Sequence, residues 1–359
     1  MVKKRIKQED IEYIVANFEK ITQFENKKIM ITGCAGFLGY YITHFFVNLI
    51  EDGLKIDSLI LLDTFLLGKP EWIEKIEGSY SNVKIYSFDI SKDDISQLKD
   101  SKDVDYILHM ASIASPTFYR KYPVETIDAN IWGLRRLIDY YKDSEIKGFL
   151  FFSSSEVYGD PTEGNIPTSE EYRGNVSCMG PRACYDEAKR FGETISYIFA
   201  NKYKMPISIV RPFNNYGPGM SINDMRVPAD FAKCVLNNKD IYIHSDGNPT
   251  RTFCYVADAI VGYLKVLTYG KFDYFNIGIA KPEINVQRLA EIYSDAAKDL
   301  FGYNIKIIFR KSKDVEYLTH NPFRRCPDIS KAVSKLGYNP KIEVEEGVKR
   351  FITFLKEEE

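Results

Sequence analysis

The sequence has few of the features that mark secreted, membrane-bound or nucleic-acid-binding proteins. Its 359 residues include only six cysteines, with no Cys-x-x-Cys pair and no neighbouring histidine cluster, so we expect neither a disulfide framework nor a metal site. No apolar run approaches the ~20 residues of a membrane span. The 48 basic and 50 acidic side chains give a net charge of −2, which offers no basic excess to a phosphate backbone. These absences favour a cytoplasmic protein with reduced thiols, and they exclude nucleic acid and membranes as expected partners.

Residues 1–27 are expected to form a helical extension. The basic start is followed by Gln8-Glu9-Asp10 rather than by the apolar core of a signal peptide. From Ile11 to Ile21 the apolar side chains recur at helical spacing, which predicts a helix. We expect this helix to pack on the body of the protein, and binding of a partner is the alternative.

From residue 28 onward, short β-rich runs alternate with segments of helical length. This alternation is typical of an α/β protein with a doubly wound parallel sheet, covered on both faces and connected by right-handed crossovers. The expected strands of this Rossmann-type core are Ile29–Thr32, Leu59–Asp63, Val83–Phe88, Tyr106–His109, Phe149–Ser153 and Ile207–Arg211. The expected helices are Leu38–Ile50, Ile127–Tyr141 and Tyr185–Tyr203.

The pattern changes after Asn214. Gly217-Pro218-Gly219 introduces shorter elements, which indicates a second, smaller region. The run Phe275-Asn276-Ile277-Gly278 again looks like a buried strand, so the two regions are expected to interleave. The expected boundaries are 28–214 for the larger domain, with about 251–280 returning to it, and 215–359 for most of the smaller, substrate-binding domain.

The first expected strand runs into Gly33-Cys34-Ala35-Gly36-Phe37-Leu38-Gly39, after which a helix begins. Such glycines let the backbone turn tightly and approach a pyrophosphate, while the helix N-terminus presents N–H groups and a partial positive charge. Ordinary turns also use glycine, but the order of strand, loop and helix favours a dinucleotide site. The candidate cofactor-binding residues of this loop are Gly33, Gly36, Phe37, Leu38 and Gly39.

Two acidic residues at strand ends indicate which dinucleotide binds. Asp63 ends the second strand, 24 residues after Gly39, where a carboxylate can bond the adenosine ribose hydroxyls and repel a 2′-phosphate. NAD is therefore expected rather than NADP, and the larger domain is the NAD-binding domain. The alternative is an aspartate that caps the turn before Thr64. Asp89, with Ile90 beside it, follows the third strand and is placed to meet the adenine.

Tyr185 and Lys189 lie four residues apart on one face of an expected helix, and Ser154 follows the strand Phe149–Ser153. A tyrosine titrates near pH ~10 and is a poor base until a nearby positive charge favours its phenolate. Lys189 supplies such a charge and can also hold the nicotinamide ribose of the cofactor, while Ser154 can hydrogen-bond the reacting hydroxyl group. Tyr-x-x-x-Lys alone occurs by chance, but with the upstream glycine loop it predicts hydride transfer.

The combination of this loop with Tyr185-x-x-x-Lys189 resembles the extended short-chain dehydrogenase/reductases, which act largely on nucleotide sugars. Within that family, three blocks look like those of UDP-glucuronate decarboxylases. They are Ser153-Ser154-Ser155-Glu156-Val157-Tyr158-Gly159-Asp160-Pro161, Gly180-Pro181-Arg182-Ala183-Cys184-Tyr185-Asp186-Glu187 and Asn223-Asp224-x-Arg226-Val227. The resemblance runs from about Lys28 to the C-terminus.

The resemblance implies a reaction as well as a fold. Oxidation of C4 of a nucleotide-linked glucuronic acid gives a ketone β to the carboxylate, and such an acid loses CO2 readily. Arg325 would then bind the carboxylate, with Ser155 as its hydroxyl partner. Glu156 would act as an acid or base, or position water, near C5. Tyr185 would be the base, and return of the hydride to C4 would regenerate NAD.

The resemblance also implies the nucleotide-sugar contacts. The arginines suit phosphate oxygens, although a surface salt bridge is the alternative for each, and Arg182 could instead be a contact at the start of a helix. A homodimer formed through the helices 127–141 and 185–203 is implied as well. The residues implied to bind substrate are Asn214, Arg226, Arg251, Arg182, Tyr158 and Arg325.

Three other functions stay open. A 4-epimerase that acts on uronic acids could also use Arg325. A 4,6-dehydratase would carry an aspartate where this sequence has Ser155, so it would lack its acid. A non-catalytic NAD-binding protein would need no Ser-Tyr-Lys-Glu constellation. The nucleotide base, the exact sugar and the release of a keto product are not determined by the sequence.

Overall fold

The computed structural model describes residues 5–310 and 322–358. Seven parallel strands form one sheet in the order β11-β6-β5-β4-β1-β2-β3. Six of them are the strands expected from the sequence, and none of their ends differs from the expected end by more than one residue. The seventh is the segment around Phe275. The strands are β1 (Lys28–Thr32), β2 (Ser58–Asp63), β3 (Val83–Ser87), β4 (Tyr106–His109), β5 (Gly148–Phe152), β6 (Ile207–Pro212) and β11 (Asp273–Ile277). The expected Rossmann-type sheet is thus confirmed.

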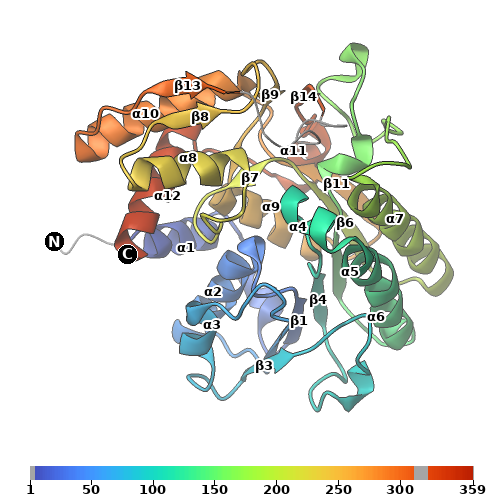
Figure 1. Cartoon of the computed structure of the whole chain (residues 1–359). Helices are drawn as coiled ribbons and strands as arrows, with labels where there is room; N and C mark the ends of the chain where they lie inside the picture. The colour runs from blue at the N-terminus through green and yellow to red at the C-terminus, as the bar shows by residue number, and fades with distance from the viewer. Residues whose placement is uncertain (1–4, 311–321, 359) are drawn as a thin grey trace.

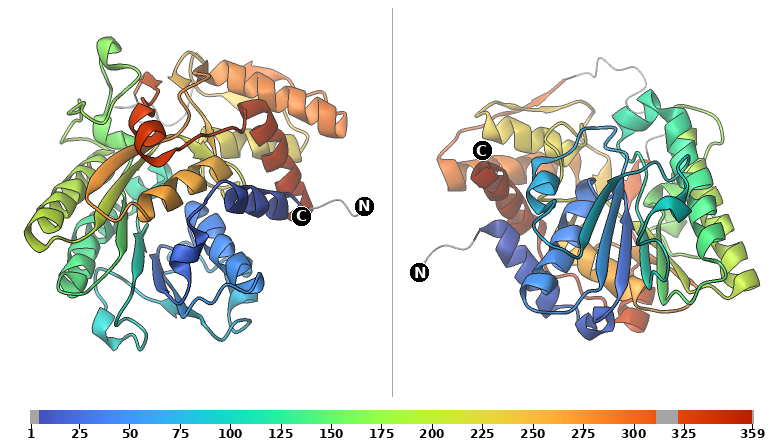
Figure 2. Two further views of the ribbon diagram at one scale, coloured as in Figure 1. Left: turned by 180° about the vertical axis from the view of Figure 1, so that it is seen from behind. Right: turned by 90° about the horizontal axis from the view of Figure 1, so that it is seen from below.

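Helices cover both faces of this sheet (Figures 1 and 2). Because side chains alternate along a strand, Ile29 and Ile31 of β1 enter the core that includes α2 and α9, while Met30 enters the core on the opposite face with α6 and α7. The helical segments of this layer are α2 (Phe37–Glu51), α3 (Glu71–Ile76), η2 (Ile95–Gln97), α4 (Pro116–Lys121), α5 (Pro123–Ile127), η3 (Asp128–Gly133), α6 (Leu134–Tyr141), α7 (Ala183–Tyr203) and α9 (Val256–Leu267). The expected helix over 127–141 is therefore part of a longer segment that starts at Pro123, a residue suited to a first helical turn.

The smaller layer packs at the carboxyl ends of the large sheet. Its strands pair as β13 with β8, β10 with β7, and β12 and β14 with β9. The strands are β7 (Asn215–Tyr216), β8 (Ile241–Ile243), β9 (Thr250–Arg251), β10 (Cys254–Tyr255), β12 (Ile284–Asn285), β13 (Ile307–Phe309) and β14 (Arg324–Arg325). The helical segments are η4 (Ser155–Tyr158), η5 (Glu163–Asn165), α8 (Val227–Leu236), α10 (Val286–Phe301), α11 (Ser330–Leu336) and α12 (Val344–Glu358). Because α9 and β11 return to the large sheet, the two layers interleave along the chain, and the exact domain boundaries stay a prediction.

The N-terminal extension forms α1 (Ile6–Ala16) and η1 (Ile21–Phe24), so the helix begins and ends about five residues before the expected stretch. Its buried Asp10 accepts hydrogen bonds from Tyr41 (2.5 Å), Tyr255 (2.6 Å) and Arg350 (3.0 Å). These donors lie on α2, β10 and α12, so α1 packs on the body of the protein as expected and joins the two layers.

No helix within residues 5–310 and 322–358 combines the length and apolar character needed to cross a bilayer.

Candidate active site

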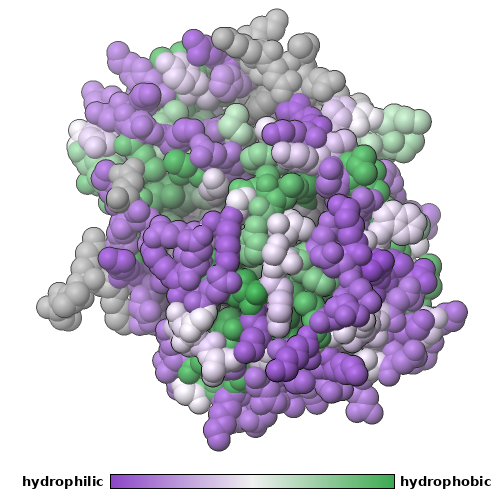
Figure 3. All heavy atoms as spheres, turned by 60° about the horizontal axis from the view of Figure 1, so that its bottom comes forward, coloured by the Kyte–Doolittle hydropathy of each residue, from purple (hydrophilic) through white to green (hydrophobic). Residues whose placement is uncertain are grey.

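A cleft of about 1660 Å³ lies between the two layers, at the carboxyl ends of the parallel strands. This is the place where open α/β sheets bind their ligands. Figure 3 shows one face on which apolar side chains gather in a seam between hydrophilic ones. The cleft is lined from β1, β2, β5 and the segment that follows β4 on one side, and from α8, β8 and β9 on the other. Both layers therefore contribute to any ligand site in it.

The glycine loop between β1 and α2 lines this cleft and fits a dinucleotide pyrophosphate. Gly33 has a φ of +73°, and a Cβ at that position would lie 2.7 Å from the backbone N of Ala111. A Cβ on Gly39 would lie 2.1 Å from the carbonyl oxygen of Cys34. Helix α2 begins within this glycine-rich stretch, at Phe37, so its N-terminal N–H groups face the space that these glycines leave open.

Asp63 holds the glycine loop in place at the end of β2. Its Oδ2 accepts a hydrogen bond from the backbone N of Ala35 (3.0 Å), and its Oδ1 accepts one from the backbone N of Phe65 (2.9 Å). Burial raises the pKa of Asp63, although these hydrogen bonds oppose the rise. The carboxylate thus caps the turn, which was the alternative role, and it also lines the cleft, which the ribose role requires.

Asp89 and Ile90 line the same end of the cleft. The Oδ1 of Asp89 accepts hydrogen bonds from the backbone N (3.0 Å) and the Oγ (2.6 Å) of Ser91, and its Oδ2 pairs with Lys92 at 3.0 Å. A contact between Asp89 and the adenine stays a prediction.

Tyr185, Lys189 and Ser154 come together at the cleft, as their spacing predicted. The Nζ of Lys189 lies 5.6 Å from the centre of the Tyr185 ring and donates a hydrogen bond to the carbonyl oxygen of Phe152 (2.6 Å). Burial lowers the pKa of Lys189 to about 7. Burial also raises the pKa of Tyr185 to about 12, although a hydrogen bond with Ser154 opposes the rise. Tyr185 is therefore protonated here, and a further positive charge must come close to make it a base.

Glu156 is the centre of a buried ion cluster next to this triad. Its Oε2 accepts from the Nη2 of Arg182 and from the Nη2 of Arg325, each at 2.6 Å. Burial opposes ionisation of Glu156, but the charges of Arg182 and Arg325 outweigh it and lower its pKa to about 2. Ser155 is buried and lines the cleft beside this cluster. The cluster thus gathers four of the sequence-predicted site residues.

Arg251 joins the cluster through the pairing of short strands. Parallel strands β9 and β14 place Arg325 opposite Arg251 in register, and like charges opposite each other repel. Burial and the charge of Arg325 lower the pKa of Arg251 to about 9. Its guanidinium donates to the carbonyl oxygens of Pro322 (2.6 Å) and Phe323 (3.0 Å), so Arg251 is anchored but keeps its charge at neutral pH.

Asn214 and Arg226 lie farther along the cleft. The Nδ2 of Asn214 donates to the carbonyl oxygen of Thr252 (2.9 Å). Arg226 forms a bidentate ion pair with Asp224, and its guanidinium lies 5.6 Å from the ring centre of Phe37 in the glycine loop. Arg226 therefore spans the two layers.

Tyr158 does not line the cleft, in contrast to the expected substrate role. It is 2% exposed, donates to the Oδ1 of Asn276 (2.7 Å) and accepts from Arg211 (2.7 Å). The physical reason is the tight turn η4, which presents its first two residues to the cleft and turns Tyr158 inward. Tyr158 instead packs in a small buried cluster with Val157 and Phe213.

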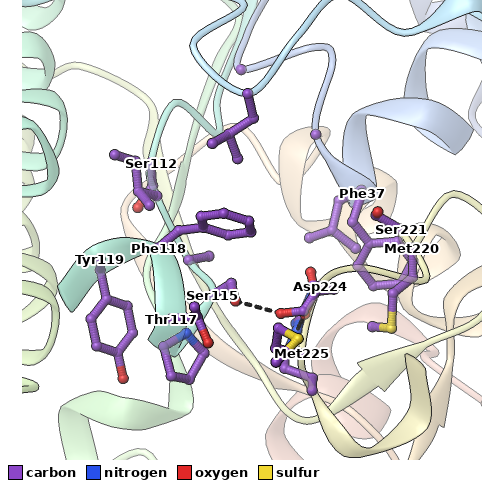
Figure 4. A pocket seen from close by; sticks show the side chains of 18 of the residues that line it. Phe37, Ser112, Ser115, Thr117, Phe118, Tyr119, Met220, Ser221, Asp224 and Met225 are labelled. Carbon is purple, nitrogen blue, oxygen red and sulfur yellow. Dashed lines mark hydrogen bonds and ion pairs between the residues drawn. The ribbon is translucent and has the colours of Figure 1, made fainter. Parts of the chain in front are cut away.

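Sequence reasoning missed two cleft residues in the segment after β4. The Oγ of Ser115 donates to the carbonyl oxygen of Asp224 across the cleft (2.7 Å; Figure 4). The ring of Tyr119 stacks on Tyr185, with centres 5.2 Å apart. Its hydroxyl is buried and has no hydrogen-bond partner within the described residues. The available signal was their position directly after the carboxyl end of a parallel strand.

Comparison with known proteins gives consistent matches. A model of the NAD dependent epimerase/dehydratase family matches residues 29–278. UDP-glucuronic acid decarboxylase 6 of Arabidopsis thaliana is 34% identical over 323 residues, which is 90% of this chain and 87% of that protein.

Two solved structures are similar over most of the chain. UDP-glucose 4-epimerase of Thermotoga maritima, solved with UDP-glucose, matches with a TM-score of 0.78 and 25% identity over 92% of this chain and 99% of that one. UDP-glucuronic acid 4-epimerase of Bacillus cereus, in complex with UDP-glucuronic acid and NAD, matches with a TM-score of 0.73 and 25% identity over 92% of this chain and 100% of that one.

Proposed function

Because the chain belongs to the NAD dependent epimerase/dehydratase family, we propose that it uses NAD to decarboxylate a nucleotide-linked glucuronic acid, converting UDP-glucuronate to UDP-xylose. The similarity to the Arabidopsis decarboxylase over nine-tenths of the chain supports this substrate.

The observation that carries the proposal is the charge balance at Glu156. Three arginines, Arg182, Arg251 and Arg325, act on this one ionised carboxylate in a buried part of the cleft. Buried charge is costly unless it is matched by opposite charge. A sugar carboxylate adds negative charge beside these arginines, whereas a neutral hexose does not.

The residues then divide the chemistry. The glycine loop and Asp63 would hold NAD, which would supply the hydride acceptor and donor for C4 of the sugar. Tyr185 accepts the proton of the C4 hydroxyl, which Ser154 holds by a hydrogen bond. Lys189 supplies part of the positive charge beside the phenol, and the nicotinamide ring of bound NAD would supply the further charge that makes Tyr185 a base. Arg325 and Ser155 hold the carboxylate that leaves as CO2. Glu156 acts as an acid or base, or positions a water molecule, for the protonation of C5.

The diphosphate would lie between the layers. Arg226 and Arg251 reach the cleft from the smaller layer, and guanidinium groups match phosphate oxygens with paired hydrogen bonds. Asn214, at the junction of the layers, would bond the sugar or diphosphate. Arg182 would contact the sugar carboxylate as well as Glu156.

Epimerisation of a nucleotide uronate at C4 is the second candidate, since the Bacillus cereus 4-epimerase has a similar fold along its whole length. Mass spectrometry separates the two. After incubation of the NAD-loaded enzyme with UDP-glucuronate, we expect a product lighter by the mass of CO2. A product of unchanged mass would favour the epimerase, and no product from any nucleotide uronate would contradict both.

A homodimer is part of the proposal. The helical segments α5, η3 and α7 lie side by side (Figure 1) and expose several large apolar side chains. They are Val124, Ile127, Trp132, Phe191 and Ile198. Exposed apolar patches of this kind mark interaction sites, and a second copy of the chain would cover this one. Light scattering tests the dimer.

A cytoplasmic location is also proposed, because all six cysteines are free thiols, as in a reducing compartment.

A further inference from the structure

Asp186 is a buried carboxyl group behind the Glu156 cluster, and the proposed reaction gives it no role. It follows Tyr185 in the first turn of α7 and is 6% exposed. Its Oδ2 lies 3.5 Å from the Nε of Arg182, and its Oδ1 has no hydrogen-bond partner within the described parts of the chain. A buried acceptor without a partner is rare enough to require an explanation.

Arg182 connects this carboxyl group to the cleft. Its Nη2 is 2.6 Å from the Oε2 of Glu156, whereas its Nε, on the side of Asp186, makes no hydrogen bond to a described residue. The guanidinium is thus held closely by Glu156 and loosely by Asp186. A small change in the charge at Asp186 would change how strongly Arg182 is drawn away from Glu156.

The groups that face Asp186 come from four elements. Arg182 and Tyr185 belong to its own helix or the cap of that helix, Glu156 lies on η4, Arg325 on β14, and Tyr119 on α4. Burial and the charge of Glu156 raise the pKa of Asp186 to about 7, although Arg182 and Arg325 oppose the rise. A second anion near these arginines would raise that pKa further, because like charges disfavour ionisation.

Resting on the proposed function, we propose that Asp186 is a positioning residue whose carboxylate takes up a proton from solvent as an anionic sugar binds. An O–H bond forms at Asp186, and one negative charge leaves the cluster while another, on the sugar, enters it. Arg182 then stays with Glu156, and Arg325 is available to the sugar carboxylate. A neutral sugar brings no carboxylate to the cluster, so it causes no uptake beyond that of the diphosphate, which both ligands share.

Proton uptake on binding can be measured directly. UDP-glucuronate and UDP-glucose are titrated calorimetrically into the NAD-loaded Tyr185→Phe enzyme at pH 7.5, in buffers of different ionisation enthalpy. A group with a pKa of about 7 that shifts upward by about one unit takes up about half a proton at this pH. We expect about this much more uptake with UDP-glucuronate than with UDP-glucose, which shares the diphosphate but has no carboxylate.

Two further variants locate the proton. Adding Asp186→Asn is expected to abolish the excess uptake with UDP-glucuronate over UDP-glucose, since the amide cannot ionise. Glu187→Gln is the matched control, because this neighbouring carboxylate on α7 is exposed and pairs with Arg190. It should leave the uptake unchanged.

The outcomes separate the role of Asp186 from the proposed decarboxylase function. An excess uptake with UDP-glucuronate that survives Asp186→Asn, or equal uptake for both sugars, would overturn the role of Asp186 while leaving the decarboxylase intact. If the enzyme does not bind UDP-glucuronate, the proposed function fails and this inference with it. Should Asp186→Asn fail to fold, equal uptake for both sugars in Tyr185→Phe would still overturn the proposal.

Discussion

Replacement of Arg325 by methionine tests the recognition of a carboxylate most directly. The Nη2 of Arg325 is 2.6 Å from Glu156, and the side chain is 11% exposed. Methionine keeps most of the buried volume but removes the charge. Glu156 keeps its contact with Arg182, also at 2.6 Å, so the variant is expected to fold. The loss should therefore fall on the ligand rather than on the protein.

The expected size follows from the strength of a charged hydrogen bond. Such a bond contributes about 1.5–3 kcal/mol, and each 1.36 kcal/mol is a factor of ten. We expect the affinity of Arg325→Met for UDP-glucuronate to fall about 10- to 150-fold. The affinities for UDP-glucose and NAD should change about twofold or less, because neither presents a carboxylate to this position.

Equilibrium binding to enzyme that also carries Tyr185→Phe, which prevents turnover, gives the three affinities in one series. The informative quantity is the ratio of the dissociation constants for UDP-glucose and UDP-glucuronate. A loss of equal size for both sugars would refute the reasoning, because it would mean that Arg325 shapes the cleft rather than recognising the carboxylate.

Three further predictions concern the cofactor side of the cleft. Tyr185→Phe should lower the rate of CO2 release about 10²- to 10⁴-fold with unchanged NAD affinity, and a parallel loss of NAD binding would contradict its role as a base. Lys189→Met should stabilise the ligand-free protein more at pH 7 than at pH 10. The reason is that the unfolded chain keeps the lysine proton up to about pH 10.4 while the folded state releases it near pH 7, so wild-type stability rises across that window. Equal shifts in melting temperature at both pH values would show that Lys189 carries no burial penalty. Gly39→Ala should abolish NAD binding, since the added Cβ would lie 2.1 Å from the Cys34 carbonyl oxygen, whereas Gly164→Ala, with nothing within 4 Å, is the control.

Local sequence patterns were sufficient for the sheet and the dinucleotide loop. Strands such as β1 are short apolar runs bounded by turn residues, and the glycine loop specifies its own geometry. Tyr185 and Lys189 could be placed together because four residues separate neighbours on one helix face. These features depend on contacts close in the sequence, so one chain alone reveals them.

The remainder of the site depends on contacts between distant segments. Arg325 and Glu156 were predicted as site residues, but their ion pair joins positions 169 residues apart. The same holds for Ser115, which meets the loop of Asp224. Tyr158 was assigned to the cleft because it lies in a recognisable block, yet the turn that contains it directs it inward. A motif indicates which segment approaches a ligand, whereas the backbone conformation decides which of its side chains do.

The in-register placement of Arg251 and Arg325 has a consequence for local dynamics. The strands β9 and β14 are each only two residues long, so few hydrogen bonds oppose the repulsion between the two guanidinium groups. An anion that bridges them would remove the repulsion and hold the strands together. Amide hydrogen exchange at β9 and β14 should therefore slow on binding of UDP-glucuronate by more than on binding of UDP-glucose. The bound ligand would thus stabilise this small sheet, and the rate at which β9 and β14 unfold locally would depend on the charge of the sugar.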